Sequence, residues 1–138
     1  MIVAFTDGSS LGNPGHMGIG IALYRDGFRI EELSEYLGKG TNNIAEYTAV
    51  IRALETVHRL GEKEVHIKSD SQLIIRQLNG EYKVKDPKLR PLKMQVDGLC
   101  HGIKASFEHI PREHNAEADK LSKEGAELGR RREAKHGD

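Results

Sequence analysis

Four of the 21 acidic side chains in this sequence stand where predicted elements could bring them together: Asp7, Glu46, Asp70 and Asp119. Four carboxylates share a site only if something positive lies among them, because like charges oppose each other's ionisation. Ligation by oxygen alone suits a hard cation such as Mg²⁺ or Mn²⁺. Two such ions, roughly 3.5–4 Å apart, can clamp a phosphodiester, activate water and stabilise the leaving oxygen. The chemistry open to these four residues is therefore metal-dependent phosphodiester hydrolysis.

Two of the acids follow predicted strands. Asp7 follows the apolar run 2–6, which is typical of a buried strand, and Asp70 follows a short strand over 65–69. If these strands are parallel neighbours, both carboxylates emerge at the same edge of the sheet, where open α/β sheets place their ligands. Aspartate is also common in ordinary turns and at helix N-caps. For Asp7 or Asp70 taken alone, such a structural role remains an alternative to ligand binding.

Glu46 belongs to a predicted helix over 44–60 that ends before Gly61. At helical spacing it points along the same stripe as the apolar Val50 and Val57. Asn43 is a plausible N-cap, and its spacing from Glu46 also fits a capping box. A carboxylate aimed at a sheet calls for a partner, and a cation is the simplest one.

Asp119 lies in the first turns of a predicted final helix over 115–128. Asn115, Asp119, Ser122 and Ala126 share one face of it, and the small residues would let this face approach a sheet closely. The alternative is an exposed aspartate that only complements the helix dipole.

The remaining pattern predicts the frame that positions these acids. Strands at 2–6, 18–24 and 28–37 have short connections and should form an antiparallel meander. The first helix and the fourth strand are followed by a short helix over 71–78 and a polar loop over 81–87. An amphipathic helix over 88–102 and a fifth strand over 105–110 come next. A charged tail over 130–138 follows the final helix. Strands followed by strand–helix alternation indicate an α/β protein, with a mixed five-stranded sheet flanked by helices.

Composition limits the alternatives. A chain of 138 residues with 37% hydrophobic and 30% charged residues should form one domain with a real core. No apolar run approaches the roughly 18–20 residues that cross a bilayer, and no signal peptide is evident. One cysteine, Cys100, allows neither an internal disulfide nor a Cys-rich zinc module, which fits a cytoplasmic protein without a membrane partner. The 21 basic and 21 acidic residues cancel, so a local site or a metal must attract any anion.

Four segments resemble, in order, the motifs of type 1 ribonuclease H. The first motif combines residues 6–10, 12–15 and 18–20, and the other three are 41–47, 69–72 and 114–121. Each of these four motifs contains one of the four acids. The resemblance spans residues 1 to about 128. It implies a ribonuclease H-like catalytic domain over 1–128, with sheet order 3-2-1-4-5 and strand 2 antiparallel, followed by a charged and flexible tail over 129–138.

The resemblance implies an endonuclease that cuts the RNA strand of RNA/DNA hybrids and leaves a 5′-phosphate and a 3′-hydroxyl. The four acids would bind two Mg²⁺ or Mn²⁺ ions. The protein would need no obligate protein partner and would act as a monomer. Substrate contacts are expected from Gly8, Ser9, Asn13, Thr41, Asn42, Asn43 and Gln72. Amide side chains can bridge base edges and sugars, and the 2′-hydroxyl distinguishes RNA from DNA.

The sequence departs from well-known family members in two places. It lacks the long basic insertion that some members use as a handle, and it contains no tryptophan, which leaves Tyr82, Lys83 and Lys85 in that region. We expect weaker substrate affinity or a different grip, and no hybrid-binding domain upstream. Many members carry a mobile histidine in a longer loop before the last helix. Here Arg112 or His114 could replace it, and Arg112 is the preferred candidate.

Other readings fit less well. The glycines within residues 8–20 are not followed by Gly-Lys-Ser/Thr, so a nucleotide-binding P-loop is not expected. They also do not open a helix, so a dinucleotide-binding fold is not expected either. The Cys100 and histidine spacing matches no usual zinc site. Position 9 is serine, which argues against a proofreading exonuclease, and Glu108 is too far along for an integrase-like enzyme. A non-catalytic hybrid-binding domain on the same fold remains an alternative, although it would be expected to have lost one of the four acids.

Overall fold

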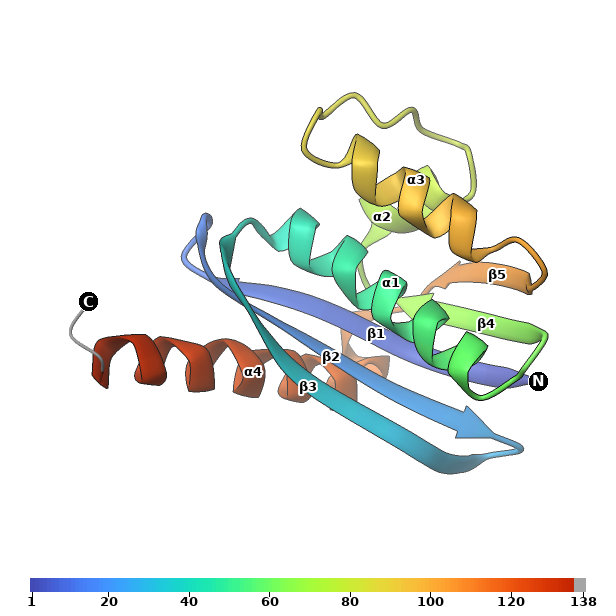
Figure 1. Ribbon diagram of the computed structural model, residues 1–138, viewed down its shortest axis with the longest axis horizontal. Helices are drawn as coiled ribbons and strands as arrows, with labels where there is room; N and C mark the ends of the chain where they lie inside the picture. Colours follow the sequence, from blue (N-terminus) through green and yellow to red (C-terminus); the bar gives the residue numbers. More distant parts are fainter. Residues whose placement is uncertain (136–138) are drawn as a thin grey trace.

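The computed structural model describes residues 1–135, which form one five-stranded sheet with helices on both faces (Figure 1). The strands are β1 (Ile2–Leu11), β2 (Gly15–Arg25), β3 (Phe28–Gly40), β4 (Glu64–Ser69) and β5 (Lys104–His109). The helices are α1 (Asn42–Arg59), α2 (Gln72–Leu78), α3 (Arg90–Leu99) and α4 (Ala116–Lys135), with a short 3₁₀ helix at Arg112–His114. The strand order is β3-β2-β1-β4-β5, which confirms the predicted topology.

The first three strands form the predicted meander, but they are longer than expected. The β2–β3 connection contains Asp26 and Gly27, both with positive φ (53° and 83°), as a two-residue hairpin turn requires. β1 does not end before Asp7. It continues to Leu11 because its antiparallel pairing with β2 runs on to His16 through the glycine-rich segment. The expected turn is thereby confined to residues 12–14.

The parallel strands are joined by helical crossovers. β4 pairs in parallel with β1 and with β5, and α1 connects the meander to β4. Gly61 follows α1 with φ 73°, and the Glu62 amide donates to the Val57 carbonyl, which closes the helix with a glycine as the sequence predicts. α2 begins one residue later than predicted because Ser71 is its cap, whereas α3 covers only 90–99 of the predicted 88–102.

The main core lies between the sheet and α1. Tyr47, Val50, Leu54 and Val57 of α1 are fully or almost fully buried in it. α3 packs against the same helix and contributes Val96 to the core. α4 covers β1, β2 and β3 from the opposite face, so the sheet is sandwiched where its first three strands run (Figure 1). The half-buried Cys100 packs against the core, in line with a packing role.

α4 is the element that differs most from expectation. It was expected to end at 128, yet it continues to Lys135 along the edge of the meander. The Tyr36 ring occupies the space beside Gly129, and the Tyr36 hydroxyl donates to Glu133 at 2.8 Å. Residues 129–135, which were predicted from the sequence to belong to the tail, are therefore helical, and residues 136–138 lie outside the described residues. Among residues 1–135, no helix is both long and apolar enough to span a membrane.

Candidate active site

The acids singled out in the sequence come together at one end of the sheet. One ligand atom each from Asp7, Glu46 and Asp70 lies within 4.8 Å of the other two. Asp119 lines the same pocket, which has a volume of about 320 Å³. The four side chains come from β1, α1, the residue after β4, and α4, so they meet only in the folded chain.

Strand pairing brings the two sheet aspartates side by side. The parallel ladder between β1 and β4 ends at the pair Thr6↔Ser69, and Asp7 and Asp70 are the next residue on each strand. The prediction that both carboxylates emerge at one edge is therefore correct. Its premise needs one correction, because β1 itself continues and only its pairing with β4 stops at this point.

Glu46 reaches the aspartates because α1 lies unusually close to β1. A Cβ at Gly8 would come within 2.2 Å of the Ala45 carbonyl carbon, so only glycine fits there. The Gly8 amide donates a hydrogen bond to the Glu46 carboxylate. The capping-box alternative is wrong, since the N-cap is Thr41, whose hydroxyl accepts from the Ile44 amide. Glu46 points at the strand instead.

α4 approaches from the other face of the sheet, again over glycines. Cβ atoms at Gly18 and Gly20 would lie within 2.0 Å of the Ser122 carbonyl oxygen and 2.1 Å of the Ala118 carbonyl oxygen, respectively. The predicted small-residue face of this helix is thus the one that packs. Its position sets Asp119 at the pocket, where Lys123 forms an ion pair with it at 3.0 Å.

Two residues behind the carboxylates were not predicted as site residues. The buried Asn115 amide group donates to the Asp70 carboxylate at 3.1 Å and to the Thr6 carbonyl at 2.9 Å. The Ser122 hydroxyl donates to Asp7 Oδ2 at 2.7 Å. In the sequence they share a helix face with Asp119, and Asn115 also lies in the segment 114–121, but neither signal revealed which acids they would contact.

Burial and mutual repulsion make the cluster costly to ionise. The pKa of Asp7 is raised from 3.8 to about 7, first by burial and then by the Asp70 and Asp119 charges, against the lowering effect of the Ser122 hydrogen bond. The pKa of Glu46 is raised well above its usual value by burial and by Asp7. Such a cluster favours either protonation or the arrival of a cation.

Most of the other predicted site residues surround this pocket. Gly8, Ser9, Asn42, Asn43 and Arg112 line it together with the acids. They come from β1, the start of α1 and the 3₁₀ helix that precedes α4. The backbone amides and side chains of these segments therefore face the same space as the carboxylates.

Three predicted contact residues lie outside the pocket lining. The Asn13 side chain accepts a hydrogen bond from the Asn42 amide at 3.1 Å, which ties the β1–β2 turn to the start of α1. Thr41 caps that helix. Gln72 is exposed at the start of α2, two residues after Asp70.

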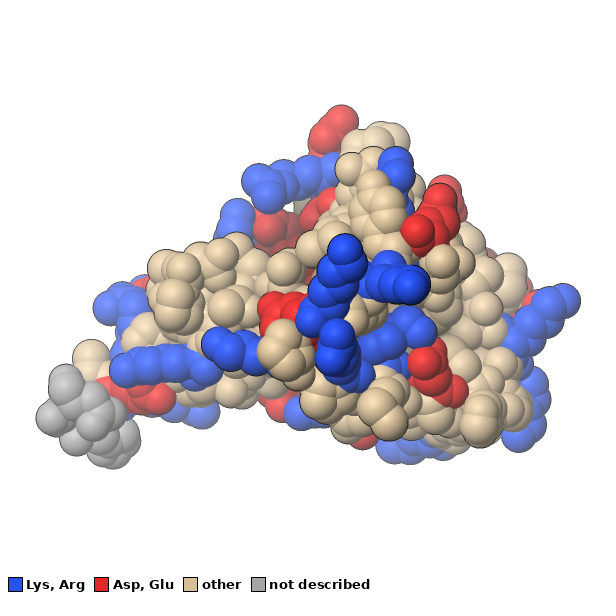
Figure 2. Space-filling model, turned by 90° about the horizontal axis from the view of Figure 1, so that it is seen from above, with Lys and Arg blue, Asp and Glu red and all other residues tan. Residues whose placement is uncertain are grey.

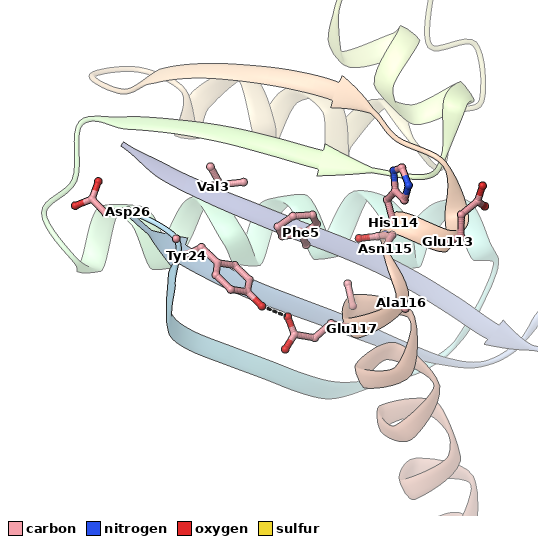
Figure 3. Close-up of a pocket in the computed structure, with 11 residues that line it drawn as sticks. Val3, Phe5, Tyr24, Asp26, Glu113, His114, Asn115, Ala116 and Glu117 are labelled. Carbon is pink, nitrogen blue, oxygen red and sulfur yellow. Dashed lines mark hydrogen bonds between the residues drawn. The ribbon is translucent and has the colours of Figure 1, made fainter.

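His114 lies apart from the acids. It lines a second pocket of about 460 Å³ on the α4 side of the sheet, with Phe5 and Tyr24 on one wall (Figure 3). The Tyr24 hydroxyl donates to Glu117 across this pocket at 2.5 Å. Of the two candidates for the loop position, only Arg112 shares a pocket with the carboxylates.

Positive charge is gathered locally rather than carried as net charge. Figure 2 shows Lys and Arg side chains clustered near the middle of one face, next to Asp and Glu side chains. At the acidic pocket itself, the basic residues in the lining are Arg112 and Lys123. They supply positive charge next to an acidic cluster in a chain whose formal charge is zero.

Comparisons with known proteins give this geometry a family. Residues 5–125 match the family model described as "Reverse transcriptase-like". Ribonuclease HI of Halobacterium salinarum is 39% identical over 123 residues, which cover 88% of this chain and 62% of that protein. A bifunctional protein of Mycobacterium tuberculosis is 35% identical over 124 residues, but these cover only 34% of its length. The chain thus spans less than two thirds of the curated relatives it matches.

Solved structures agree closely with this one. The crystal structure of RNase H1 from Halobacterium salinarum superposes with a TM-score of 0.87 at 38% identity, covering 90% of this chain and 96% of that one. LC11-RNase H1, solved in complex with an RNA/DNA hybrid, superposes with a TM-score of 0.89 at 40% identity, covering 94% of this chain and 99% of that one. The family model, the sequence relatives and the two structures all agree with the acid-bearing motifs, and the chain belongs to the type 1 ribonuclease H family.

Proposed function

We propose that this chain is an endonuclease that hydrolyses the RNA strand of RNA/DNA hybrids and leaves 5′-phosphate and 3′-hydroxyl ends. The observation that carries the proposal is the convergence of Asp7, Glu46 and Asp70 within 4.8 Å, in a pocket that Asp119 also lines. The ribonuclease H names of its relatives, and the hybrid bound to LC11-RNase H1, support the choice of substrate.

The donor set fits divalent cations. Asp7 and Glu46 are largely buried, and burial together with the neighbouring carboxylate charges raises the pKa of both. The hard oxygen ligands favour Mg²⁺ or Mn²⁺, and we propose two ions, held by Asp7, Glu46, Asp70 and Asp119. When bound, such ions would activate water and stabilise charge on the leaving oxygen.

The other residues of the pocket bind and orient the substrate in this proposal. Asn42 and Asn43 stand at the start of α1, where side-chain amides can reach the sugars and base edges of a minor groove. Asn13 and Thr41 adjoin this segment, and Gln72 stands two residues after Asp70; in this proposal all three extend the contact along the hybrid. The Gly8 and Ser9 backbone lies against the carboxylates, where it can approach the phosphate chain closely.

Arg112, rather than His114, acts on the phosphate in this proposal. A guanidinium binds phosphate oxygens with paired, charge-assisted hydrogen bonds, and Arg112 lines the pocket. We propose that the enzyme acts as a monomer, because Asp7, Glu46 and Asp70 converge without a contribution from a second copy. A chain with a single cysteine would suit the reducing cytoplasm.

The test is cleavage of a hybrid labelled on the RNA strand, with Mg²⁺, with Mn²⁺ and with a chelator. All-RNA and all-DNA duplexes are the substrate controls, and Asp70→Asn is the variant. The proposal expects cation-dependent cutting of RNA in the hybrid alone, which Asp70→Asn abolishes while its thermal unfolding stays cooperative. If the wild type is folded and binds the hybrid but never cuts it, the non-catalytic binding domain becomes the better reading. A fully active Asp70→Asn variant would refute the site.

A further inference from the structure

Ser122 is placed to act on Asp7 without touching substrate. It is fully buried in α4, and its hydroxyl lies 2.7 Å from Asp7 Oδ2 and 2.9 Å from the Asp119 carbonyl oxygen. A serine hydroxyl carries one hydrogen, and an ionised carboxylate is a stronger acceptor than a carbonyl. The hydrogen therefore goes to Asp7 when that carboxylate is charged.

The location of this hydroxyl is fixed by packing that cannot easily relax. A Cβ at Gly18 or Gly20 would come within 2.0 Å or 2.5 Å of the Ser122 backbone, so the helix lies directly on the strand there. Gly20 is the residue paired with Asp7 across the β1–β2 ladder. The donor thus stands on a rigid element directly behind the strand segment that carries Asp7.

A carboxylate on a short side chain can rotate about its last bond, because this torsion has a broad, shallow profile. A hydrogen bond to one oxygen stops that rotation. In the structure, Ser122 engages Oδ2 from the α4 side, while one carboxylate oxygen of Asp7 lies within 4.8 Å of ligand atoms of Glu46 and Asp70.

We propose that Ser122 is a positioning residue that holds the Asp7 carboxylate in the orientation that binds the divalent cation. This inference rests on the proposed function, since it gives Ser122 a role only if Asp7 is a cation ligand. Groups that orient metal ligands in this way commonly change metal affinity by 10- to 100-fold when removed.

The test measures Mn²⁺ binding calorimetrically without substrate, and hybrid cleavage separately. Ser122→Ala removes the donor and adds no atom to the contact with β2. The matched control is Ser34→Ala, which deletes a hydroxyl that bonds the neighbouring Leu121 carbonyl at 2.6 Å but has no contact with the acids. Ser122→Ala should weaken Mn²⁺ binding by about 10-fold or more. Its kcat should recover at high Mn²⁺ while the KM for the hybrid stays unchanged. Ser34→Ala should leave Mn²⁺ affinity at the wild-type value.

The outcomes separate the two proposals. Equal Mn²⁺ affinity in wild type and Ser122→Ala overturns the positioning role and leaves the proposed function standing. A wild type that binds no Mn²⁺ overturns both. A wild type that binds Mn²⁺, with Ser122→Ala weakened, but cuts no hybrid refutes only the enzymatic proposal. If Ser122→Ala fails to fold, Ser122→Cys replaces the hydroxyl with a slightly larger and weaker donor, and wild-type Mn²⁺ affinity in that variant would overturn the inference.

Discussion

Asp7→Asn should make the cation-free protein more stable at neutral and alkaline pH, although it should abolish activity. The folded state raises the pKa of Asp7 from 3.8 to about 7. Between these values the folded chain holds a proton that the unfolded chain has lost. The free energy of unfolding therefore falls as the pH rises through this window. At 1.36 kcal/mol per pKa unit, the loss is at most about 4 kcal/mol. Asparagine carries no charge, and its oxygen can still accept from Ser122, so the variant escapes this loss.

The assay is urea unfolding with a chelator at about pH 5 and about pH 8. The stability of Asp7→Asn relative to wild type should increase between the two pH values by about 3 kcal/mol, because about two of the pKa units that separate the folded and unfolded states lie above pH 5. The control Asp26→Asn, in the exposed β2–β3 turn, should show no such change. Adding Mg²⁺ at about pH 8 should stabilise wild type and not Asp7→Asn. A difference between wild type and Asp7→Asn that does not change with pH would refute the reasoning.

Two further predictions concern packing and chemistry. Gly8→Ala should lower the free energy of unfolding by about 3 kcal/mol or more, because the added Cβ would lie 2.2 Å from the backbone of α1. In Gly98→Ala, the control, the added Cβ meets nothing within 4 Å. This variant should be neutral or stabilised by about 0.5–1 kcal/mol in the same urea titration. Equal effects of the two would contradict the close approach. Arg112→Ala should lower kcat for the hybrid at least about 10-fold, while His114→Ala stays near wild type; the reverse order in steady-state kinetics would assign the role to the histidine.

The sequence predicted the site better than the details of the elements that build it. Glu46 was correctly placed facing the sheet, since helical periodicity is a local property of α1. Asp7 and Asp70 were correctly placed together because each follows a predicted short strand and the resemblance implied a sheet order in which these two strands are neighbours. The capping box failed for a different reason: several polar residues precede α1, and only the folded turn shows that Thr41 is the cap.

The errors share a physical cause, which is contact between segments far apart in the chain. β1 runs past Asp7 because β2 returns alongside it, although the glycines of this segment indicate a turn when read alone. α4 extends to Lys135 because Tyr36 of β3 packs against Gly129 and bonds Glu133. The role of Ser122 likewise depends on a side chain more than a hundred residues away, so no local pattern could reveal it.

The most direct test of this account is to locate the cations. Crystals of the protein grown with Mn²⁺ and a hybrid would be measured for anomalous scattering at the manganese edge. The account predicts manganese peaks within ligand distance of Asp7, Glu46 and Asp70, with the RNA strand against the same pocket. Manganese bound elsewhere, or a hybrid seated on the opposite face of the sheet, would contradict it.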